Sequence, residues 1–140
     1  MEVEVSWLGV ILATVASLVI GALWYAPFAF GKQWQKLVGL TDKQMKEGGG
    51  VGIMKAVVGG FITAYVLAHI TYLSSVFYSG VSFTMSGALT GFYVWLGFSA
   101  TTLLIHDGFE LRPPKLTIMK MTSQLVTLVA MGLIIGLVGV

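Results

Sequence analysis

The chain has 140 residues and a formal net charge of +2, with 56 % hydrophobic and 10 % charged residues. Because a water-soluble domain carries about 25 % charged residues, this composition excludes a soluble globule, and the length allows a single domain. The eight basic residues lie in or beside the gaps between apolar runs, as membrane-flanking lysines do, so we expect no nucleic-acid partner.

Four continuous apolar runs cover most of the chain, over about residues 5–27, 53–77, 83–105 and 116–138. A bilayer core about 30 Å thick needs roughly 20 helical residues to cross it, and each run is long enough. Transmembrane β-strands alternate in polarity over about ten residues, which these runs do not. The pattern therefore predicts an all-α integral membrane protein with four transmembrane helices, forming one domain over residues 1–140.

The connector between the first two runs, residues 28–50, has a helical pattern of its own. Phe30 and Trp34 fall on one face of this helix, whereas Lys32 and Lys36 lie on the other. This spacing predicts an amphipathic helical connector at the cytoplasmic surface of the membrane.

A second short helix is expected further along the same connector. Thr41, with Gln44 three residues later, forms a capping box, in which each side chain bonds the backbone N–H of the other residue. Gly48, Gly49 and Gly50 follow, and glycine disfavours helix because it loses the most backbone entropy on ordering. We therefore predict that this helix stops at the three glycines, which then form a flexible hinge before the second run.

Basic residues flank only two of the three connectors. They are Lys32, Lys36, Lys43, Lys46 and Lys55 around the first, and Arg112, Lys115 and Lys120 around the third. The N-terminus carries Glu2 and Glu4, and the turn at residues 78–82 is uncharged. Because basic residues collect on the cytoplasmic side, we predict a multi-pass protein of the inner (plasma) membrane with both termini outside the cytoplasm.

Small residues recur at intervals of four, a spacing that lets helices approach closely in lipid. The stripes are Gly9, Ala13, Ser17 and Gly21 in the first run, Gly52, Ala56, Gly60, Ala64 and Ala68 in the second, and the GxxxG pairs Gly87 with Gly91 and Gly132 with Gly136 in the others. They predict either packing inside the bundle or a subunit interface. We expect a homo-oligomer, with a dimer favoured.

His69 lies inside a predicted transmembrane helix, and Tyr65 and Tyr72 share its helix face. An intramembrane polar group is a functional candidate, so these residues could form a proton relay or contact a ligand. The structural alternative is a neutral histidine that is hydrogen-bonded inside the bundle. The predicted mid-membrane segments contain no carboxylate, which disfavours a proton-coupled antiporter.

The densest group of ionisable residues is His106, Asp107, Glu110 and Arg112, directly after the third run. If the helix continues through it, His106 and Glu110 share a face and could bind a divalent metal, exchange protons or gate a pathway. The alternative is a structural, salt-bridged loop in which Arg112 or Lys115 neutralises the acids, and the glycine after Asp107 could end the helix. We assign no catalytic residue, no cofactor and no metal.

Several short motifs resemble one family across nearly the whole chain. They are Leu23-Trp24-Tyr25-Ala26-Pro27, Phe30-Gly31-Lys32 with Trp34, Gly91-Phe92, Trp95-Leu96-Gly97-Phe98, and Phe109-Glu110 with Arg112-Pro113. In these motifs the chain is similar to the uncharacterised bacterial and archaeal membrane proteins grouped as domain of unknown function 1761. The resemblance implies four transmembrane helices and no established activity, and it singles out Trp24, Tyr25, Glu110 and Arg112. Tryptophan and tyrosine at a helix end also form an interfacial aromatic belt without any further function.

Two functions of different classes fit these features. The first is transport or conduction of a small solute or ion by an oligomer, with an apolar or cationic-aromatic substrate contacted by Trp24, Tyr65, Tyr93 and Trp95. The second is a non-catalytic interaction or regulatory protein whose basic connector docks a partner or an anionic lipid. A lipid-modifying enzyme that uses the 106–110 carboxylates and histidine as acid and base is a third possibility, but the sequence has no phosphate-binding loop or strong metal motif to support it.

Overall fold

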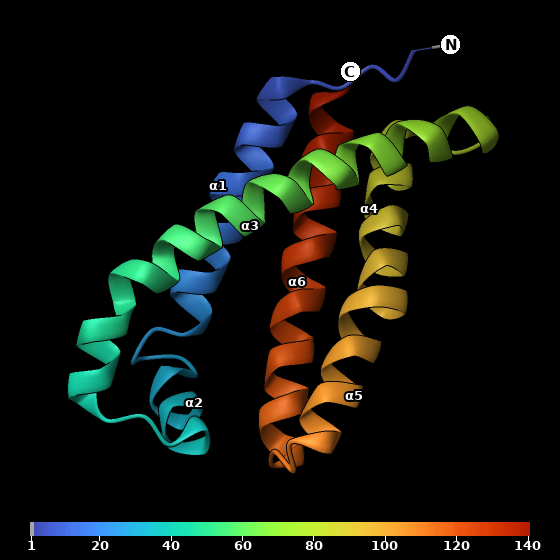
Figure 1. Cartoon of the computed structure of the whole chain (residues 1–140). Helices are drawn as coiled ribbons and strands as arrows, with labels where there is room; N and C mark the ends of the chain where they lie inside the picture. The colour runs from blue at the N-terminus through green and yellow to red at the C-terminus, as the bar shows by residue number, and fades with distance from the viewer. Residues whose placement is uncertain (1) are drawn as a thin grey trace.

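The computed structural model describes residues 2–140, and its regular structure over that range is entirely helical. The elements are α1 (Trp7–Trp24), α2 (Gly31–Val38), α3 (Asp42–Phe77), α4 (Phe83–Val94), the π-helical η1 (Trp95–Ala100), α5 (Thr101–Phe109) and α6 (Pro114–Val138). Figure 1 shows their arrangement. The elements α4, η1 and α5 follow one another without a break and form one long helix.

Four of these helices are long and apolar enough to cross a membrane: α1, α3, the α4–η1–α5 helix and α6. Each corresponds to one of the four predicted runs, so the all-α prediction and the four membrane-length helices are confirmed. The third helix extends past residue 105 to Phe109, because Gly108 remains helical. It ends just before Leu111, whose φ of 55° lies in the left-handed region that a right-handed helix cannot contain.

The centre of the bundle is α6, which packs against α4 on one side and against α1 on another. The long helix α3 crosses these three helices obliquely, and the start of α1 lies at the same end of the molecule as the end of α6 (Figure 1). A buried apolar core forms where α1, α3 and α6 meet, and it comprises Val10, Ala13, Ala64, Leu67, Ala68, Leu128, Met131 and Ile135.

The helices α4 and α6 touch backbone to backbone at their glycines. A Cβ added to Gly87 would overlap the carbonyl oxygen of Gly132, and one added to Gly132 would overlap that of Gly87. One turn further along α6, Thr84 Oγ1 donates a 3.2 Å hydrogen bond to the Gly136 carbonyl. Larger side chains at these glycines would therefore push the two helices apart. That the glycines drive helix association in a bilayer stays a prediction.

The small residues of α1 and α3 meet over only part of their stripes. A Cβ added to Gly60 of α3 would lie 2.8 Å from Ser17 Oγ of α1, so the helices are close at this level. Gly21 and Gly52, by contrast, have nothing within 4 Å of the position that a Cβ would take. The two helices therefore diverge toward the end that carries α2, as Figure 1 shows.

The helix α3 runs without a break through residues 48–50, so the predicted stop and hinge at the three glycines are wrong. Its start is as predicted: the Thr41 hydroxyl accepts a hydrogen bond from the Gln44 backbone N–H, and the Gln44 side chain accepts one from the Thr41 backbone N–H. Each glycine lowers helix stability by about 1 kcal/mol relative to alanine. The capped first turn and the long apolar segment that follows keep the backbone helical across them.

The connector contains the short helix α2, which ends at Gly39 with a left-handed φ of 82°. Its first residue, Gly31, lies so close to the end of α1 that a Cβ there would overlap the carbonyl oxygen of Tyr25. The chain therefore turns back sharply after α1, and α2 lies below α1 in Figure 1. A helix is present in this part of the connector, and its position at a cytoplasmic membrane surface stays a prediction.

Candidate functional site

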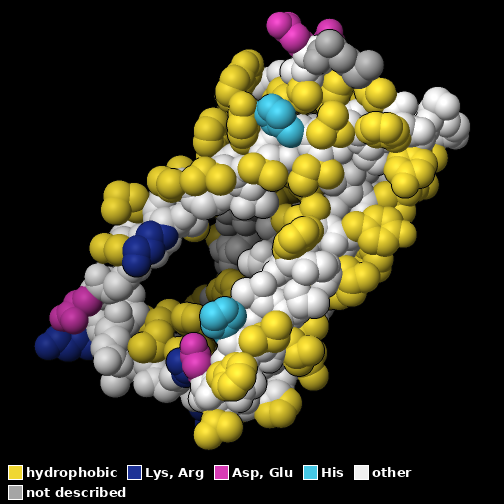
Figure 2. Space-filling model, turned by 45° about the vertical axis from the view of Figure 1, so that its right-hand side comes forward, with side chains coloured by type: hydrophobic (Ala, Val, Ile, Leu, Met, Phe, Trp, Pro, Cys, Tyr) yellow, Lys and Arg dark blue, Asp and Glu magenta, His cyan; other side chains and the backbone are white. Residues whose placement is uncertain are grey.

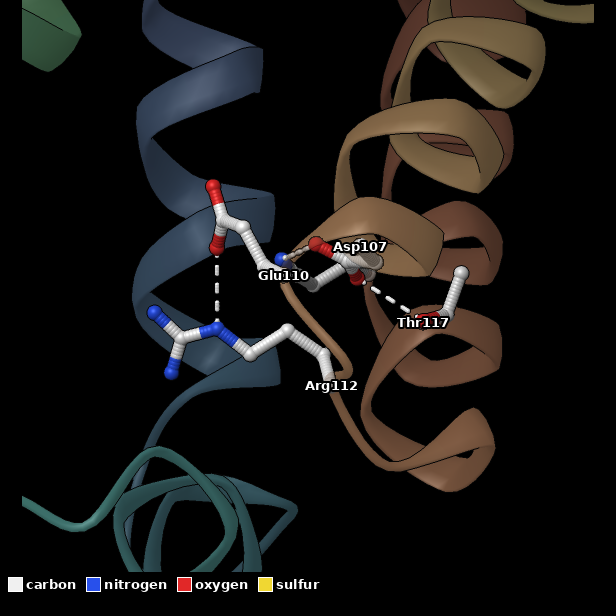
Figure 3. A network of polar contacts seen from close by, with 5 residues as sticks. Asp107, Glu110, Arg112 and Thr117 are labelled. Carbon is white, nitrogen blue, oxygen red and sulfur yellow. Dashed lines mark hydrogen bonds and ion pairs between the residues drawn. The ribbon is translucent and has the colours of Figure 1, made fainter.

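Asp107 is a buried carboxylate at the end of the bundle where α5 turns into α6, and only 4 % of its surface is exposed. Thr117 Oγ1 donates to one carboxylate oxygen at 2.8 Å, and Lys120 Nζ donates to the other at 2.7 Å. Both donors belong to the first two turns of α6, and Figure 3 shows Thr117 facing Asp107 across the helix pair. Each carboxylate oxygen therefore has the polar partner that a buried charge requires.

Glu110 and Arg112 form a separate ion pair, in which Arg112 Nε lies 2.9 Å from Glu110 Oε2. Both side chains are exposed, and in Figure 3 they extend away from the contact between Asp107 and Thr117. The turn is closed by the Arg112 backbone N–H, which donates to the Asp107 carbonyl oxygen at 2.9 Å. Exposed ion pairs contribute little free energy, so this pair shapes the turn more than it stabilises the fold.

The structure thus divides the predicted group at residues 106–112 into two ion pairs and an exposed His106. Arg112 neutralises Glu110, but the partner of Asp107 is Lys120, which the sequence analysis did not assign to it. Across the described residues 2–140, no three His, Asp or Glu side chains are grouped so that they could hold a metal ion. The turn is salt-bridged, and a binding or gating role for it stays a prediction.

Trp24 and Tyr25 lie where α1 ends, and the following segment folds back onto them. The Trp24 ring packs on Phe30 with centroids 4.8 Å apart, and Tyr25 meets Trp34 of α2 edge to face at 5.4 Å. These aromatic contacts attach α2 to the end of α1. They also place Tyr25 and Trp34 in the wall of a cavity.

His69 lies in the second half of α3, far along the chain from the turn at residues 106–112. Its Nδ1–H donates to the Tyr65 carbonyl oxygen at 2.9 Å, and the two rings are 4.3 Å apart. Tyr65 in turn stacks on Trp7, the first residue of α1, at 5.6 Å. Tyr72 lies one turn further along α3 and is half-buried. This hydrogen bond joins His69 to its own helix at an exposed position, so a histidine bonded inside the bundle, a relay and a ligand contact all stay predictions.

A cavity of about 840 Å³, called the first cavity below, lies between α1, α2, α3 and α6. It occupies the region where α1 and α3 diverge, and Figure 2 shows an opening through the molecule beside the oblique α3. Small residues form much of its wall: Gly21, Ala22, Gly49, Gly52, Ala56, Gly59 and Gly60. Its polar side chains are Ser17, Tyr25, Thr63, Ser123, Gln124 and Thr127.

Sequence reasoning identified many of these small residues but read them only as packing stripes. The signal it could have used is that Gly49 and Gly59 lie three and seven positions from Gly52, which places them on the same helix face as the α3 stripe. At all three glycines nothing lies within 4 Å of the position of a Cβ. A helix face that has small residues and no neighbour leaves space, and here that space is the first cavity.

The charged pair at the end of the bundle lies close to this cavity along α6. Lys120 precedes Gln124 by one helical turn, and side chains at that spacing share a helix face. Gln124 lines the first cavity, whereas the Lys120 ammonium group is held by Asp107. The positive charge nearest to the cavity on α6 is therefore neutralised by a carboxylate.

Four apolar helices, with α6 packed against the other three and a cavity between them, define the class of small all-helical proteins whose helices are long and apolar enough to span a membrane. Residues 8–136 match the family described as "Protein of unknown function (DUF1761)", and the chain belongs to this family. The match covers nearly the whole chain and confirms the resemblance seen in the sequence motifs. No match was found among curated proteins or among solved structures.

Proposed function

We propose that this protein binds a small, uncharged, largely apolar molecule in the first cavity and acts as a carrier-type membrane protein. The observation that supports the proposal is the cavity itself. Its volume of about 840 Å³ lies in the range of small-molecule sites, roughly 300–1,000 Å³. Such sites have mostly apolar walls with a few polar groups that orient the ligand, which is the composition of this cavity.

The proposed ligand is uncharged because the cavity offers no charge to bind an ion. The lining side chains, all within residues 2–140, are neutral: hydroxyls, one amide, aromatic rings and aliphatic groups. Burying an unpaired ionic group in such surroundings is costly. The polar groups of the wall can instead orient a neutral molecule, with Gln124 offering both a donor and an acceptor.

The geometry supports a carrier better than a channel because the core closes the cavity along the direction of α6, and the opening seen in Figure 2 passes to the side, beside α3. Leu128 and Met131 belong both to the cavity wall and to the buried core of α1, α3 and α6. At the other end the wall is formed by Trp34 of α2 and Met45 of α3. A channel requires a continuous path through the protein, whereas a carrier holds its ligand in a site that is closed on one side.

Filling the cavity tests this proposal. Gly52→Leu places a side chain into the cavity, whereas Gly50→Leu changes the same type of residue on the same helix outside the cavity wall. We expect a small uncharged phenyl diazirine to photolabel the 123–131 segment of the wild-type protein in phosphatidylcholine nanodiscs. Gly52→Leu should lower this labelling severalfold, and Gly50→Leu should leave it unchanged.

Circular dichroism of both variants serves as the control for folding. Equal labelling of the 123–131 segment in the two folded variants would contradict the proposal, because the probe would then react from the surrounding lipid.

A further inference from the structure

Gln124 of α6 places a side-chain amide in the wall of the first cavity. It lies on the same face of α6 as Leu128 and Met131, which follow it by one and two helical turns and pack into the core of α1, α3 and α6. The cavity occupies the region where α1 and α3 diverge, so the same helix face is covered at Met131 and exposed at Gln124. The amide is therefore accessible to a molecule in the cavity.

The position of Gln124 along α6 is deep. It follows Pro114, the first residue of the helix, by ten positions, which is about 15 Å at a rise of about 1.5 Å per residue. A bilayer core is about 30 Å thick, so the amide lies near its middle if α6 crosses a membrane. A polar group at that depth is costly unless it has a hydrogen-bond partner.

The amide of Gln124 makes no hydrogen bond within the described residues 2–140, in contrast to neighbouring polar side chains. Thr122 and Thr127 of α6 each donate a 2.8 Å hydrogen bond to the backbone carbonyl oxygen one turn earlier. Ser17, in the α1 part of the cavity wall, donates at 2.7 Å to a carbonyl oxygen of its own helix. Gln124 thus keeps both its N–H groups and its carbonyl oxygen for a bound molecule.

A primary amide offers a donor and an acceptor side by side in one plane. A molecule that carries an N–H and a C=O on the same edge, as a lactam does, satisfies both groups at once. A ketone or an ester satisfies only the donor and leaves the amide carbonyl oxygen unpaired. A site that hydrogen-bonds its ligand in this way discriminates strongly against an analogue without the matching group.

A second cavity, of about 510 Å³, lies between the last part of α3 and the α4–η1 segment and is called the second cavity below. It shares no lining residue with the first cavity. Its lining residues carry hydroxyl, aromatic and aliphatic groups but no amide and no charge. The paired donor and acceptor of a free amide are therefore a property of the first cavity.

We propose that the ligand of the first cavity is a neutral, largely apolar molecule with a lactam-type edge, whose N–H and C=O pair with the Gln124 amide. The inference rests on the function proposed for this cavity and names the chemical class of its ligand. The free amide selects the hydrogen-bonding groups, and the uncharged wall excludes an ion. The volume of about 840 Å³ accommodates an apolar ring attached to the lactam.

The test is a competition with the phenyl diazirine in phosphatidylcholine nanodiscs. The competitors are 4-phenylpyrrolidin-2-one, which is a lactam, and its N-methyl derivative, which keeps the carbonyl oxygen but has no N–H. For each protein we compare the concentrations of the two competitors that halve labelling of the 123–131 segment. In the wild type we expect the lactam to be favoured roughly tenfold more than in Gln124→Met, because the N-methyl derivative leaves the amide carbonyl oxygen without a donor.

The variants serve as controls for lipid and for structure. Gln124→Met replaces the amide by an apolar side chain of similar length, so its ratio reports how differently the two competitors partition into lipid. Thr122→Val changes an exposed residue of α6 outside the cavity wall and should keep the ratio of the wild type. Circular dichroism checks that both variants are folded.

The outcomes separate this inference from the function on which it rests. If the phenyl diazirine does not label the 123–131 segment of the wild type, both proposals are wrong. If it does, and the ratio is the same in the wild type and in Gln124→Met, the ligand class alone is wrong. Equal competition in the wild type, corrected for measured partition coefficients, overturns the inference even if Gln124→Met does not fold. Loss of a wild-type dimer in Gln124→Met, with no lactam preference, would assign the amide to a second copy of the chain instead.

Discussion

At the scale of single residues, the contact of most consequence is the one that neutralises Asp107. Its carboxylate is buried where α5 meets α6, and it accepts hydrogen bonds from Thr117 and Lys120 of α6. The Lys120 side chain is 25 % exposed, so its aliphatic part lies along the helix while its ammonium group is bound by Asp107. The pair joins two helices that are separated in the chain by a turn containing two prolines.

Replacing the carboxylate should weaken this junction. Asp107→Asn leaves the Lys120 ammonium without a countercharge, and we expect the free energy of unfolding to fall by about 2–3 kcal/mol. The measurement is an SDS titration of the purified protein followed by circular dichroism. Glu110→Gln is the matched control, because it breaks the exposed ion pair of the same turn and should change the free energy by less than about 1 kcal/mol. If both variants lowered the free energy of unfolding by similar amounts, the buried pair would contribute no more to stability than the exposed pair.

At the scale of secondary-structure elements, glycine has opposite consequences in two helices. In α4 and α6 it permits a backbone contact, because Gly87 and Gly132 lie against each other without side chains between them. In α3 nothing from outside the helix lies within 4 Å of the position that a Cβ would take at glycines 48–50, so there they only lower the intrinsic stability of the helix. The neighbouring elements decide which effect applies at each position.

This contrast gives opposite expectations for the same substitution. Gly132→Ala forces a Cβ into the Gly87 backbone, and we expect the free energy of unfolding to fall by about 1–3 kcal/mol as the helices separate. Gly48→Ala meets open space and should raise the free energy by up to about 1 kcal/mol, since alanine favours helix. Both values come from the SDS titration used for Asp107. A stabilising Gly132→Ala would mean that α4 and α6 are not in contact at this level.

At the scale of the whole molecule, the basic residues and the first cavity lie toward the same end. The basic residues lie in α2, the first half of α3, the turn from α5 to α6 and the first two turns of α6, and the first cavity is bounded by α2. If basic residues mark the cytoplasmic side, the first cavity faces the cytoplasm and the second lies toward the outer side. Residues 41–59 are all exposed, so much of the first half of α3 is free to contact lipid or a second copy.

Single cysteines can determine the orientation, because the chain contains none. Ser79→Cys lies in the turn between α3 and α4, and Lys43→Cys lies at the start of α3. With both termini outside the cytoplasm, a membrane-impermeant maleimide added to intact cells should label Ser79→Cys and spare Lys43→Cys. Permeabilised cells provide the control, since both positions are exposed and should then react. The reverse pattern in intact cells would contradict the predicted orientation.

Much of the fold could be predicted because it depends on local pattern. Continuous apolar runs of sufficient length determined the four long helices, and Thr41 with Gln44 determined where α3 begins, since a capping box needs only residues three positions apart. The predicted helix stop at glycines 48–50 was wrong because the low helix propensity of glycine is a weak preference, which the helix on either side can override. The short motifs spread along the chain indicated the family, which the match over residues 8–136 confirms.

Only the tertiary structure decided which distant groups meet. Lys120 and Asp107 are 13 positions apart across a turn, and their pairing depends on how α5 and α6 pack. The two cavities exist because α3 crosses the bundle at an angle, so its first half diverges from α1 while its last part leaves space beside α4. Crossing angles result from side-chain packing between helices, which the periodicity of one chain segment does not encode. The sequence by itself thus determined the helices and the family, and the packing of α3 against α1, α4 and α6 decided where the two cavities lie.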